Sequence, residues 1–68
     1  MKAIRVEAKS GARIVFRQDS GSRWSLWVRN AVTGTDVRFE GGISVQEVMD
    51  AMKRFKAAGE YSIAYTLE

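Results

Sequence analysis

The sequence predicts a small α+β domain in which a four-stranded antiparallel meander precedes one helix, packed on one face, and a fifth, C-terminal strand completes the sheet (β-β-β-β-α-β). Three observations predict it. Four segments before residue 41 alternate apolar and polar residues, short glycine-containing stretches separate them, and a helix-start motif is followed by one more alternating segment. Because no proline, low-complexity tract or linker interrupts the 68 residues, we expect residues 1–68 to form a single domain.

The first four strands are predicted by a period of two, which places alternate side chains on opposite faces of a sheet. In each segment one set is mainly apolar and the other is rich in charged residues, as in strands with one buried and one open face. The predicted inner sets are Ile4, Val6 and Ala8; Ile14 and Phe16; Trp24, Leu26 and Val28; and Thr35, Val37 and Phe39.

Three short turns agree with this alternation, because residues paired across a hairpin must lie on the same face. Two predicted loops have three residues and one has four, and each ends in glycine, which suits the left-handed residue that closes such turns. The predicted loops are residues 9–11 between Ala8 and Ala12, residues 19–21 between Gln18 and Ser22, and residues 31–34 between Asn30 and Thr35.

A helix-start motif lies at residues 43–48. Ser44 is predicted as the N-cap, Glu47 completes a capping box, and apolar residues at both ends of the motif form a hydrophobic staple. Gly59 suits the left-handed residue that ends a helix, and Gly41-Gly42 is interpreted as the turn from the fourth strand into the helix. The apolar stripe, which we expect to be buried, is Val45, Val48, Met49, Met52 and Phe55.

Residues 61–67 alternate again and predict the fifth strand, with Tyr61 and Tyr65 sharing the inner face. A helix of about 15 residues spans roughly 22 Å, which is long enough to return the chain across the sheet. We expect it to cover the face that carries Trp24 and the aliphatic residues, because its apolar stripe must be buried. The sequence leaves open whether the fifth strand lies beside the first or the fourth.

The composition favours a binding protein over an enzyme. The chain has no cysteine and no histidine, so the commonest general base, the thiol nucleophile and the usual zinc ligands are missing, and we expect neither catalysis nor a cofactor or metal. The lack of cysteine is compatible with a reducing compartment, the cytoplasm. No apolar run approaches the roughly 20 residues that span a bilayer. The net charge of +3 favours anionic partners.

The two tryptophans of RWSLWVR, residues 23–29, are three positions apart and therefore point in opposite directions in a strand. Trp24 has the parity of the apolar set and is predicted to be core, which places Trp27 on the open face. Six of the seven arginines are predicted there, and with three acidic residues they account for the net charge of +3. The residues predicted on the open face are Arg5, Glu7, Arg13, Val15, Arg17, Arg23, Ser25, Trp27, Arg29, Asp36, Arg38 and Glu40.

A tryptophan among arginines on a sheet is typical of a stacking platform for single-stranded nucleic acid, in which the ring holds a base and the cations follow the phosphates. The sequence therefore favours a non-catalytic module that binds a polyanion, and among polyanions single-stranded DNA or RNA. In this interpretation Trp27 stacks on a base, Arg13, Arg17, Arg23 and Arg29 contact phosphates, and Arg5 and Arg38 lie at the margins.

The same face fits other interpretations. Tryptophan and arginine are typical hot spots of protein interfaces, so the chain is alternatively a small inhibitor or adaptor that grips an acidic protein surface with these residues. Cross-strand pairs of arginine and glutamate also occur on merely solvated sheets, and a homodimer through an edge strand or through this face is a further possibility. No membrane partner is expected, because the polar side of the predicted helix carries acidic as well as basic residues.

Two resemblances in layout point to the same two kinds of partner. The segment GISVQEVMDAMKRF, which follows the predicted meander, resembles the strand-to-helix passage of PC4-like single-strand DNA-binding proteins, although the fifth strand departs from that pattern. The succession of hairpins, one helix and a last strand is similar to that of several tiny phage proteins that inhibit host or defence machinery by binding it. Neither resemblance supplies residues that transfer to this chain.

Overall fold

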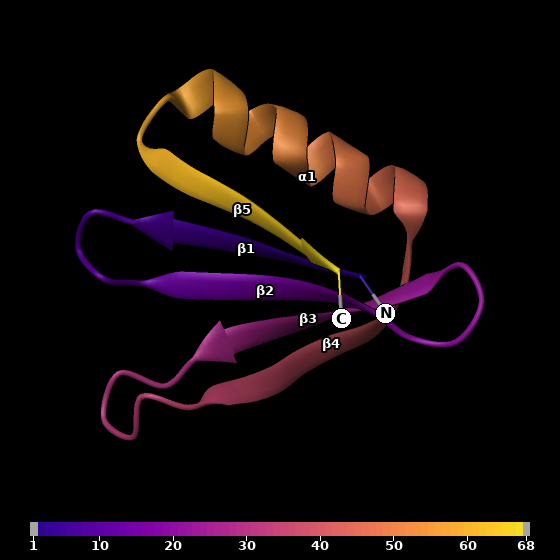
Figure 1. Cartoon of the computed structure of the whole chain (residues 1–68), viewed down its shortest axis with the longest axis horizontal. Helices are drawn as coiled ribbons and strands as arrows, with labels where there is room; N and C mark the ends of the chain where they lie inside the picture. The colour runs from indigo at the N-terminus through magenta and orange to yellow at the C-terminus, as the bar shows by residue number, and fades with distance from the viewer. Residues whose placement is uncertain (1, 68) are drawn as a thin grey trace.

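The computed structural model describes the backbone of residues 2–67 and the side chains of residues 2–66, and it has the predicted α+β architecture (Figure 1). The five strands form one antiparallel sheet with the order β4-β3-β2-β1-β5, so the fifth strand pairs with the first. The helix connects one edge strand, β4, to the other, β5. The elements are β1 (Lys2–Ala8), β2 (Arg13–Gln18), β3 (Arg23–Arg29), β4 (Asp36–Ser44), α1 (Val45–Ala58) and β5 (Tyr61–Leu67).

The first and third hairpins have the predicted registers. In the β1–β2 hairpin the backbone N–H of Ala8 donates to the carbonyl of Ala12 over 2.9 Å, and Gly11 closes the turn with a φ of +93°, a value that favours glycine. In the β3–β4 hairpin the N–H of Asn30 donates to the carbonyl of Thr35 over 2.8 Å. Both turns therefore bring the apolar sets of their strands to one face, as the alternation requires.

The second hairpin is shifted by two residues, so its predicted register is wrong. The N–H of Asp19 donates to the carbonyl of Arg23 over 2.8 Å, the loop is residues 20–22, and Gln18 pairs with Trp24. A shift of two residues leaves every side chain on its predicted face. The hydrophobic pattern therefore does not distinguish the observed register from the predicted one.

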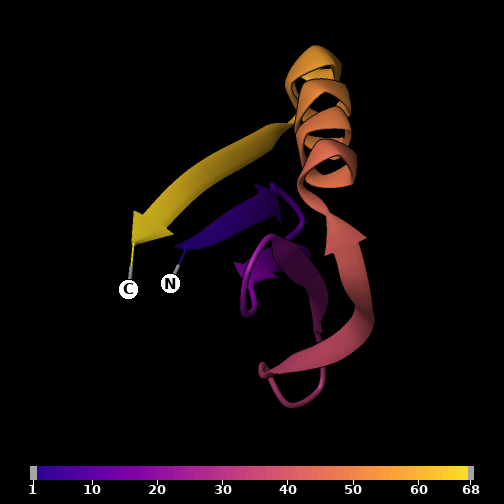
Figure 2. The ribbon, with the colours of Figure 1, turned by 90° about the vertical axis from the view of Figure 1, so that its right-hand side faces the viewer.

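Strand β4 continues through Gly41-Gly42, which were predicted to form the turn into the helix. Its register with β3 shifts twice, once on each side of Glu40. Each shift adds one residue to β4, so the two bulges together restore the alternation and bring Ile43 opposite Trp24. Gly42 has a φ of +66°, the left-handed backbone that such a bulge uses. The glycines therefore lie within an edge strand that curves toward the helix instead of ending it (Figure 2).

Helix α1 begins and ends where its caps predict. The hydroxyl of Ser44 accepts a hydrogen bond from the backbone N–H of Glu47 and donates one to the Glu47 carboxylate, both over 3.2 Å. Gly59 follows the last turn with a φ of +70°. In the part of the chain that the structure describes, no helix is both long enough and apolar enough to cross a membrane.

The core lies between α1 and the sheet face that carries Trp24, as predicted. Trp24 is 6% exposed and is confirmed as a core residue. Apolar residues of four strands surround it and pack against the buried stripe of the helix. The buried cluster comprises Val6, Phe16, Trp24, Ile43, Val48 and Met52.

Part of the predicted inner face is not covered by the helix. Figures 1 and 2 show α1 near β5 and the end of β4, far from the β3–β4 hairpin. Val37 and Phe39 on β4 are therefore exposed, Phe39 by 74%, so their predicted burial is wrong. The same correction applies to Val45 and Met49 at the margin of the helical stripe and to Tyr65 on β5. A helix is about 10–12 Å wide with its side chains, whereas five strands span about 19 Å, so one helix does not cover the whole face of the sheet.

Candidate polyanion-binding face

The sheet face opposite α1 gathers the arginines. The registers place Arg5, Val15, Trp27 and Arg38 in one row across β1 to β4, with Ala64 of β5 at its end. Residues paired across strands share a face, and the remaining arginines have the same parity within their strands. We call this surface the arginine face, and it carries Arg5, Arg13, Arg17, Arg23, Trp27, Arg29 and Arg38.

Three carboxylates lie on the arginine face, those of Glu7, Asp19 and Asp36. Glu40 was predicted there as well, but the bulges of β4 bring it opposite a residue of the helix side. The predicted loop 19–21 includes Asp19, but in the structure Asp19 continues the parity of Arg17. The alternation of β2 already indicates this placement. With six arginines and three carboxylates, the face keeps a charge of +3.

The Arg13–Asp36 pair is the least exposed ion pair of the face. Nε and Nη2 of Arg13 donate to Oδ1 of Asp36 over 3.3 and 3.0 Å, and the contact reaches from β2 across β3 to β4. The two side chains are only 23% and 27% exposed. Arg13 is therefore held in place and connects the middle of the sheet to its edge.

Two other arginines form looser pairs. Nε of Arg5 lies 3.2 Å from Glu7, and Nη2 of Arg38 lies 3.9 Å from Asp19. The four side chains are between 41% and 57% exposed, and exposed ion pairs contribute only about 0–1 kcal/mol. Arg5 and Arg38 can therefore exchange these partners for another anion at little cost.

Arg23 and Arg29 bind backbone carbonyls near the two ends of β3. Nη1 of Arg23 donates to the carbonyl of Gly42 over 3.4 Å, and Nη1 of Arg29 donates to that of Gly11 over 3.2 Å. A guanidinium has five N–H donors, so each side chain is oriented by one contact and keeps most of its donors for a ligand.

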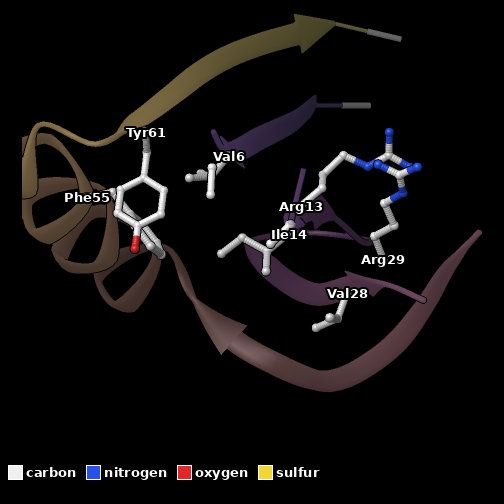
Figure 3. Close-up of a pocket in the computed structure, with 9 residues that line it drawn as sticks. Val6, Arg13, Ile14, Val28, Arg29, Phe55 and Tyr61 are labelled. Atoms are coloured by element: carbon white, nitrogen blue, oxygen red, sulfur yellow. The ribbon is translucent and has the colours of Figure 1, made fainter. Parts of the chain in front are cut away.

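Figure 3 shows how the alternation separates two chemistries near the turn between β1 and β2. The aliphatic side chains point toward Phe55 and Tyr61, which stack edge to face and border an apolar cavity of about 240 Å³. Arg13 and Arg29 also line this cavity, but their guanidinium groups extend away from the two rings. The core and the arginine face are therefore the two sides of the same strands.

Trp27 belongs to a hydrogen-bonded and stacked cluster. Its indole N–H donates to Oγ of Ser25 over 2.9 Å, and the Ser25 hydroxyl lies 3.1 Å from Oδ1 of Asp19, to which it donates. The guanidinium of Arg17 lies over the indole ring, 5.2 Å from its centroid. The ring is thus held in one orientation with a cation over it. Alternation predicted Ser25 on this face, but not that this residue, only 1% exposed, would anchor the tryptophan.

A hollow of about 280 Å³ lies on the arginine face. Arg5, Arg13 and Arg17 line it together with Asp36, Thr66 and the buried side chains of Ala3 and Val15. Its volume is close to the lower end of small-ligand sites, about 300–1,000 Å³. The hollow therefore offers three guanidinium groups and one carboxylate, that of Asp36, which is paired with Arg13, around a partly apolar concavity.

Comparisons of the chain with known protein families, with curated proteins and with solved structures found no match. Functional conclusions therefore rest on the residues and their geometry. Among residues 2–67, no three acidic side chains come close enough together to hold a metal ion.

Proposed function

We propose that this chain is a non-catalytic module that binds single-stranded DNA or RNA on the arginine face. The observation that carries the proposal is the gathering of six of the seven arginines around one oriented tryptophan. Arginine suits this role because its planar guanidinium pairs with a phosphate through two parallel hydrogen bonds and also stacks on rings. A single strand can splay its bases onto such a face, whereas a duplex keeps them stacked inside.

The intramolecular contacts orient the arginines and leave them able to bind phosphate. A phosphate accepts several charge-assisted hydrogen bonds, so it can replace the carboxylates in the exposed ion pairs of Arg5 and Arg38. Arg13, held by Asp36, forms a fixed wall of the hollow, and Arg17 lines it as well. In the proposed complex one phosphate binds the guanidinium groups of this hollow, in which the Asp36 carboxylate is already paired with Arg13.

Arg17 and Trp27 form one stacking unit in this proposal. Because the guanidinium lies over the indole ring, a base that approaches from that side meets the guanidinium plane first. Guanidinium planes stack on bases as aromatic rings do, and the ring behind holds the cation in place. The base therefore stacks on two layers instead of on a bare ring.

Removing single arginines should reduce the salt dependence of binding. Each lost phosphate contact lowers the slope of log affinity against log salt by about 0.7 for a single strand, and we expect this change for Arg17→Ala and for Arg23→Ala. Arg54→Ala is the matched control, because Arg54 lies exposed on α1, away from the arginine face. Fluorescence anisotropy with labelled single-stranded DNA at several salt concentrations measures the slopes.

Labelled single-stranded RNA and duplex DNA complete that experiment. If Arg17→Ala and Arg23→Ala bind like the wild type at every salt concentration, or if Arg54→Ala lowers the slope equally, the proposed phosphate contacts are wrong. If no nucleic acid binds at near-physiological salt, the proposed function is wrong, and an acidic protein surface becomes the partner to test with the same variants.

Replacing Arg17 by lysine separates the contribution of stacking to binding affinity from the contribution of charge. Arg17→Lys keeps the cation but loses the planar group over Trp27, so we expect about fivefold weaker binding, or about 1 kcal/mol, with an unchanged salt slope. Arg29→Lys makes the same chemical change away from the ring and should alter affinity much less. Anisotropy at one fixed salt concentration compares the two, and equal losses would contradict the stacking unit.

A further inference from the structure

The two edges of the sheet differ in how they resist pairing with another strand. An edge strand leaves backbone N–H and C=O groups unpaired, and proteins usually protect such edges with charges, proline or bulges. β4 is protected by Asp36, Arg38 and Glu40 and by its two bulges. β5, with the sequence YSIAYTL, carries no charge, no proline and no glycine, and it pairs with β1 in a regular register over seven residues. β5 therefore has the properties of a strand that accepts a further strand.

The surroundings of β5 support the same conclusion. In the part of the chain that the structure describes, no strand pairs with its outer side. Tyr65 is 60% exposed and Tyr61 37%, so aromatic surface remains uncovered along this edge. A chain of 68 residues buries only about 60% of its unfolded surface, and domains of this size often gain stability from a second subunit.

The strand is also complementary to itself. When two copies of β5 pair antiparallel about Ala64, Ile63 lies opposite Tyr65 of the second copy, and Ser62 lies opposite Thr66 of the second copy. Apolar residues then meet on the helix side and hydroxyl groups on the side of the arginine face. These pairs bring no like charges together, and the small Ala64 side chain lies at the axis.

We propose that this chain forms a two-fold homodimer in which the β5 strands of two copies pair antiparallel with Ala64 at the axis. The axis is perpendicular to the joined sheet, so both arginine faces lie on the same side. Arg5 pairs with Ala64 within each copy, which places the Cα atoms of the two Arg5 residues three strand spacings apart, about 14 Å. The pairing does not depend on the proposed function, but it joins the two cationic faces into one longer surface.

Sedimentation velocity over a hundredfold range of concentration tests the dimer. We expect the wild type to reach twice its mass of 7.6 kDa, and Tyr65→Lys to raise the dimer dissociation constant at least tenfold. That variant puts a cation opposite Ile63 of the second copy and beside Lys56, whose amine lies 5.8 Å from the Tyr65 ring. Phe39→Lys is the control, because Phe39 is an exposed aromatic residue on the other edge strand.

Circular dichroism verifies that both variants are folded. A wild type that stays at the monomer mass throughout, or a dimer that dissociates with Phe39→Lys and not with Tyr65→Lys, would overturn the proposal. Each Tyr65→Lys monomer keeps a complete arginine face. Titrating this variant with single-stranded DNA therefore tests the proposed function independently of the dimer.

Disulfide cross-linking tests the register without destabilising the strand, since the chain has no cysteine of its own. Across the axis the two Cα atoms of residue 64 would be about 4.5 or 5.5 Å apart, within the range of about 4.4–6.8 Å that a disulfide spans. The two Cα atoms of residue 62 would be about 14 Å apart. After mild oxidation Ala64→Cys should migrate as a covalent dimer and Ser62→Cys as a monomer. Cross-linking of both variants alike, or of neither, would overturn the pairing.

Discussion

The Trp24→Ala variant is expected to unfold at a much lower urea concentration than the wild type. Trp24 is 6% exposed and contacts the buried cluster between β3 and α1, and replacing a buried tryptophan by alanine costs about 3–5 kcal/mol. At about 0.05–0.15 kcal/mol per residue, a chain of this length has a total stability of about 3–10 kcal/mol. The substitution therefore removes a large part of the free energy of unfolding.

Urea denaturation followed by far-ultraviolet circular dichroism measures this loss. Trp27→Ala is the matched control, because it removes the same side chain from the other face of the same strand. We expect its unfolding midpoint to lie well above that of Trp24→Ala. Equal losses in the two variants would mean that the two tryptophans do not divide between the core and the arginine face.

Trp27→Ala should instead weaken the binding of single-stranded DNA by about 1–3 kcal/mol, or roughly 5- to 150-fold. The variant loses the ring that supports the Arg17 guanidinium and the anchor that the ring makes to Ser25. The charges of the face do not change, so the salt slope should stay close to that of the wild type. Anisotropy with the same labelled strand measures both quantities.

Trp27→Phe distinguishes the contribution of the aromatic ring to binding from that of its hydrogen bond to Ser25. Phenylalanine keeps an aromatic surface for Arg17 but has no N–H to donate to Ser25, so we expect it to retain most of the affinity. If Trp27→Ala binds as tightly as the wild type while Arg23→Ala binds more weakly, the face attracts phosphates without stacking on bases. That outcome would leave the polyanion interaction and remove the preference for a single strand.

The candidate site shows how much of an arrangement of side chains an alternating sequence can predict. Parity alone assigned Trp24 to the core and Trp27 with six arginines to the opposite face, because adjacent side chains of a strand must point to opposite sides. The contacts within that face were not contained in the pattern. That Arg13 reaches Asp36 on β4, or that Arg17 covers Trp27, depends on which residues the registers bring opposite one another.

The order of elements, the helix caps, two of three hairpin turns and the grouping of the arginines could be predicted from the sequence, since each depends on local geometry or on a period of two. The remaining features depend on contacts between segments that are distant in the sequence. A shift of two residues in the second hairpin and a pair of bulges in β4 both preserve parity, so alternation does not detect them. The position of β5 beside β1 and the exposure of Phe39 and Tyr65 depend on where one narrow helix lies on a wide sheet.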